Sequence, residues 1–432
     1  MILTKRLLLF IQEEEDMNDK KWNIVVAHPD KQHSFDTAAA LKKAGFLSKY
    51  ITTVYYKKYS WIVLIYSLLN NKYKIKLKAH KCEKLDDRQV KQYCEFAAFF
   101  HMVLFRLNKK MAEKLNEQVL RKFNRNVERY ICRTKPDAVI LYDSLSGELV
   151  QSIKQQSPNT KVIIDMSAAY YPYMCDIFKS DILKNPDDST QLKTEMSSFS
   201  HFNRMRRCEM EIKYADAFLV ASNFTKKSLI AYGADEKCMY LCPYGITQNN
   251  NVYQQKSEES KLKCLYVGRI NQNKGVKYLL KAIKMLNSSN IQFTFVGTYH
   301  QLGNSIKKMY SDLLFTGHLA KEQVLEHCSK SDLLVFPSLS DGFGLSALEA
   351  MSCGTPVICS KNAGIADAIV DGYNGFLIDA QNSEQIAERI LWFANNRNKC
   401  SEMGINALET SKSYTWDHYN KCLMDAICDI LK

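Results

Sequence analysis

Short apolar segments alternate with helical segments along this chain of 432 residues, and the alternation starts afresh after a polar stretch near the middle. Strands of a parallel sheet are buried on both faces, so they read as near-continuous apolar runs, and a crossover helix joins each to the next. The pattern therefore predicts an α/β fold with two Rossmann-like domains, each built on a parallel sheet. The chain length fits two domains of about 200 residues.

The expected elements follow from apolar periodicity and from glycine stop signals. Strands are expected at residues 22–30, 51–56, 136–143, 160–167, 215–222, 262–269, 291–298, 312–317, 332–338 and 356–360. Helices are expected at residues 34–45, 147–156, 223–233, 274–286, 346–354, 383–396 and 418–432. Residues 175–200 are polar and irregular, so we expect mainly a long loop there, with some helix.

The composition changes at residues 245–261, where Asn, Gln and Ser replace the large aliphatic residues. Such a stretch is typical of a linker between domains. We therefore expect, in order, a disordered extension at 1–20, an N-terminal domain at 21–243, a linker at 244–260, a C-terminal domain at 261–410, and a helix at 411–432 that packs back on the first domain.

The 14 cysteines are scattered and include no Cys-x-x-Cys pair, so the sequence favours neither a zinc site nor a redox motif. The opening MILTKRLLLFIQEEED has a short apolar run that acids follow at once, which is not the pattern of a secretory signal. Reduced thiols and a cytoplasmic location are therefore expected.

Much of the net charge of +13 lies in the first half of the chain. The basic residues are Lys72, Lys74, Lys76, Lys78, Lys81, Lys84, Arg106, Lys109, Lys110, Lys114, Arg121, Lys122, Arg125, Arg129 and Arg133. Apolar runs at 61–69 and 96–105 lie among them, and neither reaches the roughly 20 residues that span a bilayer. Two interpretations stay open: contact with an anionic membrane surface, or a buried core helix followed by a solvated basic one. No nucleic-acid motif accompanies the charge, so nucleic-acid binding is not expected.

Two cations stand in the stretch VGRINQNKG at 267–275, between an expected strand and the helix after it. In open α/β sheets, ligands bind beyond the carboxyl ends of the strands. Arg269 and Lys274 beside a helix N-terminus could hold a phosphate or diphosphate. For either residue alone, an exposed cation on a loop would be the default interpretation.

Two further motifs end strands of the same half. FTGHLAKEQV at 315–324 places Gly317 and backbone amides where a flat ring could lie. In DGFGLSALE at 341–349, two glycines let the backbone approach a ligand, while Asp341 and Glu349 lie about 80° apart around a helix. Carboxylates accept hydrogen bonds from sugar hydroxyls. The alternative is an acid that favours the helix dipole and one solvated glutamate.

These motifs resemble those of the family 4 retaining glycosyltransferases, group 1, which have the GT-B fold of two facing Rossmann-like domains with a cleft between them. The resemblance rests on GRINQNKG, FVGT, FTGHLAKEQV, FPSLSDGFGLSALEAMSCGTPVICS and GIADAIVDGYNGFLID in the second half, and on YADAFLVASNFTKKSLIAYGADEKCMYLCPYGI in the first. It implies a hexosyltransferase-type enzyme that uses a nucleotide-diphosphate sugar.

The resemblance also implies roles for individual residues. Arg269 and Lys274 would bind the donor diphosphate, Asp341 the transferred sugar and Glu349 the ribose. Donor contacts would also come from Gly268, Gly317, Gly342, Phe343, Gly344 and Leu345. Asp341 departs from the glutamate usual in the family and is shorter by one methylene, about 1.5 Å. No protein nucleophile, no cofactor and no metal are expected, since the sequence has no D-x-D motif.

The first half departs further from the family. His28 and Pro29 stand where the family often has two glycines, and proline has no N–H to donate to a phosphate. Lys31 and His33 are the candidate replacements, with a plain polar surface loop as the alternative. At a later strand end, Asp165, Ser167 and Tyr170 are candidates for contacts with the acceptor or the sugar.

The expected function is transfer of a sugar to a glycan or lipid-linked acceptor in surface polysaccharide or glycoconjugate synthesis. The expected location is the cytoplasm, at the inner face of an anionic membrane. The alternatives are a soluble glycosyltransferase with a small acceptor and a catalytically silent subunit that binds a sugar nucleotide.

Overall fold

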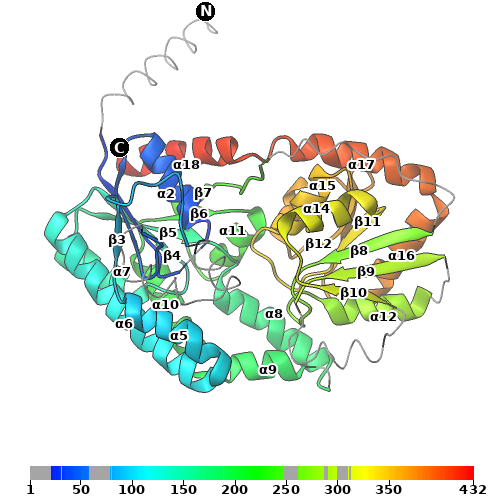
Figure 1. Cartoon of the computed structure of the whole chain (residues 1–432), viewed down its shortest axis with the longest axis horizontal. Helices are drawn as coiled ribbons and strands as arrows, with labels where there is room; N and C mark the ends of the chain where they lie inside the picture. The colour runs from blue at the N-terminus through cyan, green and yellow to red at the C-terminus, as the bar shows by residue number, and fades with distance from the viewer. Residues whose placement is uncertain are drawn as a thin grey trace, which may run out of the picture. The chain divides into compact units, whose positions relative to one another are not determined.

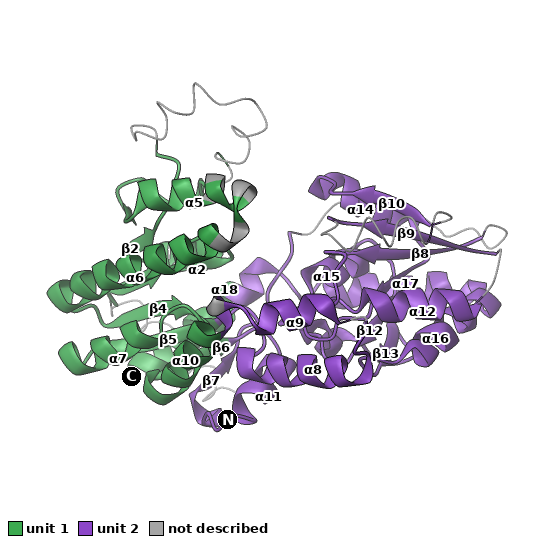
Figure 2. Ribbon diagram, turned by 90° about the horizontal axis from the view of Figure 1, so that it is seen from below, with its two compact units in different colours: residues 1–165, 202–219, 420–432 green, residues 166–201, 220–419 purple. Residues whose placement is uncertain are grey.

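The computed structural model describes residues 21–30, 32–57, 78, 80–187, 189–247, 261–286, 290–298, 310 and 313–432. These residues form two parallel sheets flanked by helices (Figure 1). Contacts divide the chain into two compact units (Figure 2). Unit 1 comprises residues 1–165, 202–219 and 420–432, and unit 2 comprises residues 166–201 and 220–419.

The first sheet has seven strands in the order β3-β2-β1-β4-β5-β6-β7. They are β1 (Ile24–Ala27), β2 (Leu47–Thr52), β3 (Val90–Gln92), β4 (Ala138–Tyr142), β5 (Lys161–Met166), β6 (Ala217–Val220) and β7 (Met239–Leu241). β4 lies between β1 and β5, with Ile24 opposite Ala138 and Tyr142 opposite Asp165. The carboxyl ends of these three strands therefore lie at one edge, where His33, after β1, meets Asp165 of β5.

The helices of the first half are α2 (Ser34–Lys43), α5 (Glu95–Leu107), α6 (Lys109–Thr134), α7 (Gly147–Gln156), α8 (Tyr171–Lys184), α9 (Thr190–Met196), α10 (Phe199–Tyr214) and α11 (Asn223–Ile230). The expected loop at 175–200 is wrong, because α8, α9 and the start of α10 cover most of it. Pro172 lies in the first turn of α8, and Met174 and Phe178 are buried one turn apart. Both side chains belong to the core of unit 2, and Ile177 and Ile182 of the same helix pack against that core.

Two other expectations for the first half need correction. The second strand, β2, ends at Thr52, so the expected strand at 51–56 was placed too late; the chain enters the strand directly after the turn at Gly45.

A buried core helix was one of the two interpretations left open for residues 96–105, and the described side chains of α5 do not fit it. In α5, Ala98 is buried, but Phe96, Phe100 and Phe105 are 68%, 58% and 51% exposed. The apolar run at 61–69 and Lys72, Lys74 and Lys76 lie outside the described residues.

The second sheet has six strands in the order β10-β9-β8-β11-β12-β13. They are β8 (Leu262–Val267), β9 (Ile291–Val296), β10 (Leu314–Gly317), β11 (Leu333–Phe336), β12 (Val357–Ser360) and β13 (Gly375–Ile378). All the strand pairs with a recorded register are parallel, as the near-continuous apolar runs predicted.

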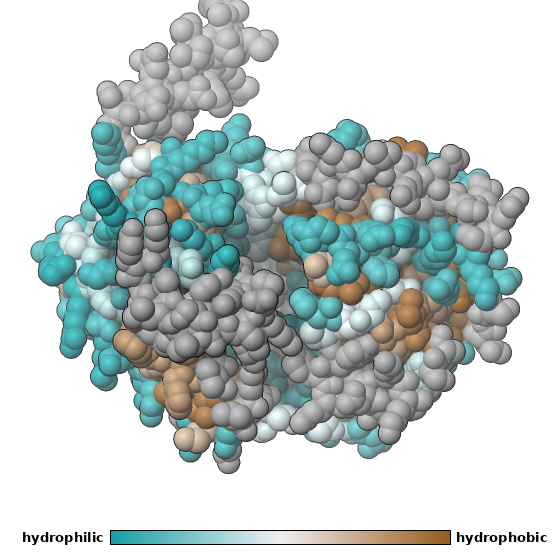
Figure 3. Space-filling view, in the orientation of Figure 1, coloured by the Kyte–Doolittle hydropathy of each residue, from teal (hydrophilic) through white to brown (hydrophobic). Residues whose placement is uncertain are grey.

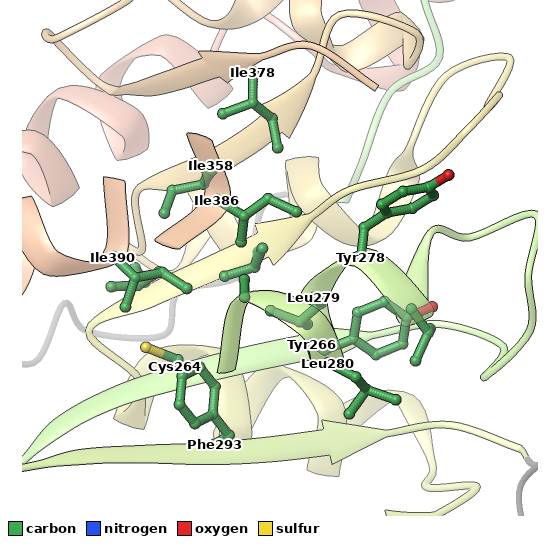
Figure 4. Close-up of a cluster of buried hydrophobic side chains, with 14 of the residues drawn as sticks. Cys264, Tyr266, Tyr278, Leu279, Leu280, Phe293, Ile358, Ile378, Ile386 and Ile390 are labelled. Carbon is green, nitrogen blue, oxygen red and sulfur yellow. The ribbon is translucent and has the colours of Figure 1, made fainter. Parts of the chain in front are cut away.

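Helices cover both faces of this sheet (Figure 1). They are α12 (Val276–Leu286), α14 (Lys321–Lys330), α15 (Leu345–Ser352), α16 (Ser383–Asn395) and α17 (Arg397–Ser411), with α18 (Trp416–Leu431) at the end of the chain. α12 packs against α16, and α15 packs against α14 and α17. Between α12, α16 and the sheet, side chains such as Leu279, Phe293, Ile358 and Ile386 form a buried core (Figure 4).

The compact units differ from the domains expected along the chain. Residues 166–201 and 220–243 were assigned to the first domain by their place in the sequence, but their contacts group them with the second half. Residues 420–432 are grouped with the first half. Of the helices in the part of the chain that the structure describes, none is both long enough and apolar enough to cross a membrane.

Candidate active site

The loop that follows β8 carries two of the predicted cations; we call residues 268–275 the cationic loop. Gly275 has φ +68°, and a Cβ there would lie 1.8 Å from the carbonyl oxygen of Pro337. The amide of Leu339 donates to the carbonyl of Asn273 at 2.9 Å. The cationic loop is therefore held against the chain that leaves β11, and only glycine fits at position 275.

The two cations of this loop are placed differently. Gly268 follows β8 directly, and Arg269 is exposed. The Tyr266 hydroxyl donates to the Arg269 carbonyl at 2.7 Å and so anchors the backbone below it. Lys274 is only 25% exposed in its side chain, and its amide donates to the Asn271 carboxamide at 3.0 Å.

The segment after β11 carries the predicted acid; we call residues 341–345 the glycine loop. The backbone of Asp341 is held on both sides, because its amide donates to the Asn362 carbonyl and its carbonyl accepts from the Gly364 amide, each at 3.0 Å. Its carboxylate accepts from the Phe343 amide at 3.3 Å. The same carboxylate forms an ion pair with the Lys274 ammonium.

Gly342 lies against the segment that follows β5. A Cβ at Gly342 would lie 2.6 Å from Cα of Ala168 and 2.7 Å from the carbonyl oxygen of Ser167. The hydroxyls of Ser222 and Thr225 donate to the Gly342 carbonyl at 2.7 and 3.2 Å. Of the five candidates in the first half, Ser167 thus lies beside the glycine loop within unit 2.

The rest of the glycine loop leads into α15. Gly344 is the residue before this helix and has φ +102°, which favours glycine. The Phe343 ring is buried and packs edge-to-face on Tyr244, with centroids 5.4 Å apart. Leu345 begins α15 and is 39% exposed. Phe343 therefore anchors the loop, while Leu345 at the start of α15 is open to solvent.

Glu349 lies on α15, and its carboxylate forms an ion pair with Lys321 at 3.1 Å. The Glu349 side chain is 19% exposed and that of Lys321 is 55% exposed. Lys321 was not among the predicted site residues, although it belongs to the FTGHLAKEQV motif; its place in the first turn of α14 was the available signal. Gly317, at the end of β10, has open space where a Cβ would lie.

In unit 1, His33 and Asp165 form a pair with Nε2 and Oδ2 2.9 Å apart. Both side chains are largely buried, at 10% and 4% exposed. The rings of His28 and His33 both lie edge-on to Tyr142. Lys31 lies outside the described residues, and Tyr170 is buried against Tyr232.

The side chain of His28 closes the turn that follows β1. The His28 ring is buried, and this burial lowers the pKa of its imidazole. Its Nδ1 accepts from the Asp30 amide at 2.9 Å. The Pro29 carbonyl accepts from the Thr53 hydroxyl. The family's glycine pair would offer free N–H groups at this position. Here the turn has the Pro29 carbonyl, and the Asp30 N–H already donates to His28.

Residues 248–410 match the model of the family Glycosyl transferases group 1. This group 1 region contains both loops and Glu349. Within the described residues, no group of three or more His, Cys, Asp or Glu side chains is placed to hold a metal ion.

Two curated relatives illustrate the similarity. An uncharacterized glycosyltransferase of Methanocaldococcus jannaschii is 34% identical over 37% of this chain and 45% of its own length. The lipopolysaccharide 1,2-N-acetylglucosaminetransferase of Salmonella typhimurium is 24% identical over 66% of this chain and 70% of its own. The chain spans less than half the length of the first three curated relatives, 45%, 48% and 42%.

Solved structures share the fold along nearly the whole chain. Sucrose-phosphate synthase from Thermosynechococcus elongatus superposes with a TM-score of 0.65 at 16% identity, over 95% of this chain and 99% of that one. Anabaena HepE in complex with UDP-glucose gives 0.60 at 14% identity, over 94% and 100%. The two parallel sheets thus match the GT-B glycosyltransferase fold, as predicted.

Proposed function

We propose that this protein is a retaining, hexosyltransferase-type glycosyltransferase that transfers a sugar from a nucleotide-diphosphate sugar to a glycan or lipid-linked acceptor. The observation that carries the proposal is the ion pair of Lys274 and Asp341, at the carboxyl ends of β8 and β11. It joins a phosphate-binding cation to a hydroxyl-binding acid at the edge where α/β sheets bind ligands. The group 1 match and the fold shared with a UDP-glucose complex support the choice of donor.

In this proposal, the donor's C1–O bond to the diphosphate breaks and a bond from C1 to an acceptor oxygen forms. The acceptor hydroxyl loses its proton to the departing phosphate on the same face, and no protein nucleophile is assigned. Arg269 and Lys274 offset the negative charge that grows on the leaving diphosphate. Asp341 holds sugar hydroxyls and Glu349 the ribose, while Gly268, Gly317 and the glycine loop line the donor.

The leaving diphosphate is stabilised by side-chain cations in this proposal, so neither a metal nor a cofactor takes part. Turnover is then expected to survive dialysis against EDTA without loss. A requirement for added Mg²⁺ or Mn²⁺ would contradict this part of the proposal. On the acceptor side, His33 with Asp165, Ser167 and Lys31 are the proposed contacts for hydroxyls.

Peripheral contact with an anionic membrane on the cytoplasmic side is also part of the proposal. On α6, six exposed cations form a basic stripe: Lys114, Arg121, Lys122, Arg125, Arg129 and Arg133. Successive members follow at helical spacing, which puts them on the face opposite the buried Phe123 and Val127. Among the described residues, none of the six forms an ion pair with an acid.

The neighbouring helix adds apolar side chains to the same hairpin. α5 and α6 are joined at Asn108, and Phe96, Phe100 and Phe105 of α5 are exposed beside Met111 of α6. Figure 3 shows hydrophobic side chains at the position that α5 has in Figure 1. Exposed aromatic residues next to unpaired cations suit the surface of an anionic bilayer, where a lipid-linked acceptor would lie.

Flotation with vesicles tests this contact. Binding to phosphatidylglycerol vesicles and not to neutral phosphatidylcholine is expected, with loss in Arg125→Glu/Arg129→Glu and in Phe100→Ser. Lys399→Glu, an exposed charge reversal in unit 2, is the control and should bind as wild type. Absence of binding at low salt would favour the soluble enzyme with a small acceptor.

Turnover of nucleotide sugars tests the activity itself. The purified protein is incubated with a panel of nucleotide sugars, and release of the nucleotide is measured with and without acceptor extracts. Lys274→Ala should lower turnover about 10²–10³-fold while the protein stays folded. Lys361→Ala, which removes an exposed ion pair with Asp379, should be unchanged. Binding of a nucleotide sugar without any hydrolysis or transfer would favour the silent subunit.

A further inference from the structure

Asp181 of α8 is a fully buried carboxylate that lies beside the cationic loop. Its side chain is 0% exposed. It accepts hydrogen bonds from Gln272 Nε2 at 2.7 Å, Lys277 Nζ at 2.6 Å and the Tyr278 hydroxyl. A buried carboxylate persists only when it is well paired, so these three donors are fixed to it.

The three donors come from the end of the cationic loop and the first turn of α12. Residues at the end of α8 and at the start of α9 also form hydrogen bonds with Gln272 and Tyr278. The carboxamide oxygen of Gln191 in α9 accepts from the Gln272 amide at 3.0 Å, and Gln272 Nε2 also reaches the Ser189 hydroxyl at 3.2 Å. The Asn185 carboxamide donates to the Tyr278 hydroxyl at 2.9 Å.

The chain that carries Asp181 also contacts the glycine loop. It begins at Ser167 and Ala168, whose backbone lies against Gly342. It then continues through α8 to α9, where Gln191 holds the cationic loop. One continuous stretch of the chain, residues 167–191, therefore contacts both loops that the proposed donor site uses.

We propose that Asp181 is a positioning residue that fixes the cationic loop, and with it Arg269 and Lys274, before the donor binds. The inference rests on the proposed function of that loop. Arg269 and Lys274 have long side chains, so a mobile loop would lose conformational entropy each time it bound a diphosphate. Cations that are already in place stabilise the leaving group without reorganisation. Asp181 reaches the donor only through Gln272, Lys277 and Tyr278.

Two variants and one control test this role. Asp181→Asn keeps the shape and removes the charge. Gln191→Ala removes only the side chain that holds the Gln272 amide, so it leaves the buried carboxylate paired. Asp176→Asn is the matched control on the same helix, since Asp176 is 56% exposed and, among the described residues, its carboxylate bonds only Lys179 and Tyr232. Affinity for inorganic pyrophosphate is measured by calorimetry, with kcat and the KM for donor and acceptor.

Asp181→Asn is expected to weaken pyrophosphate binding and to lower kcat, each at least tenfold, with an unchanged KM for the acceptor. Gln191→Ala should show the same pattern at about threefold, and Asp176→Asn should match wild type. A role in folding alone would lower the melting temperature but leave pyrophosphate affinity and kcat per folded molecule unchanged, which would overturn the inference. If Asp181→Asn does not fold, Gln191→Ala decides by the same criterion.

The wild-type protein separates this inference from the proposed function. If it binds pyrophosphate and turns over a nucleotide sugar while the folded variants behave identically, only the positioning role is overturned. If it neither binds pyrophosphate nor turns over any nucleotide sugar, the proposed function is overturned, and the positioning role with it.

Discussion

The Lys274 ammonium is paired with the Asp341 carboxylate, 67 residues later in the chain. The two side chains are 25% and 16% exposed, so solvent screens the pair only in part. Under the proposed function, the Asp341 carboxylate competes with the donor diphosphate for the Lys274 ammonium.

Asp341→Asn should bind inorganic pyrophosphate more tightly than wild type, by about threefold, because Lys274 loses its competing carboxylate and a partly exposed pair is worth up to about 1 kcal/mol. Sugar transfer should nevertheless fall, since the variant loses an acceptor of hydrogen bonds from the sugar. Calorimetry and steady-state turnover measure the two effects. Weaker pyrophosphate binding in Asp341→Asn would show that Asp341 does not compete for Lys274.

Glu349 and Lys321 form one ion pair, but their substitution by alanine should change the donor KM to different extents. Glu349→Ala is expected to raise the donor KM roughly 10- to 150-fold, because a lost hydrogen bond to a charged group costs about 1.5–3 kcal/mol. Lys321→Ala should change the same KM less than about fivefold, since its side chain is 55% exposed and exposed pairs contribute little. Equal effects of the two variants would place the ligand contact on Lys321 as well.

Two glycines with similar φ angles separate backbone strain from steric overlap. Gly317→Ala places a Cβ in open space at φ +78° and should cost about 1–2 kcal/mol of unfolding free energy from strain alone. Gly275→Ala, at φ +68°, places a Cβ 1.8 Å from the Pro337 carbonyl oxygen, so it should cost about 3 kcal/mol or more and disturb donor binding. Chemical denaturation measures both. Similar costs would mean that the loop at Gly275 moves away without penalty.

The buried Glu211 makes stability depend on pH. Its carboxylate accepts from the Ser144 and Ser146 amides at 2.8 and 2.9 Å, but burial raises its pKa to about 7 from an ordinary 4.5. Between these two values, the folded protein binds more protons than the unfolded chain, so the unfolding free energy should fall as pH rises from about 4.5 to about 7. Glu211→Gln should flatten this part of the profile. The same slope in the variant would assign the pH dependence to other groups.

Much of the fold could be predicted because its signals are local. The strands β4 and β11 are runs of buried apolar residues, and glycines mark the ends of some helices, such as Gly45 after α2 and Gly354 after α15. The expectation for 175–200 failed because the residues from Asn185 through α9 are mostly polar, and α9 buries Leu192 alone among its described side chains. α8 is stabilised by contacts with α12, such as the ion pair of Asp181 with Lys277, which lies 96 residues later in the chain.

The sequence by itself determined that the chain has two parallel sheets. It also determined that Arg269 and Lys274 follow one strand and that Asp341 and Glu349 follow another, because the end of a strand and the turn after it depend on consecutive residues. Only the tertiary structure decided that Lys274 meets Asp341, that His33 meets Asp165, and that Asp181 holds the cationic loop. Those contacts join residues 67, 132 and 91 positions apart. They depend on strand order and on which face each helix buries, and neither is encoded in a local stretch of sequence.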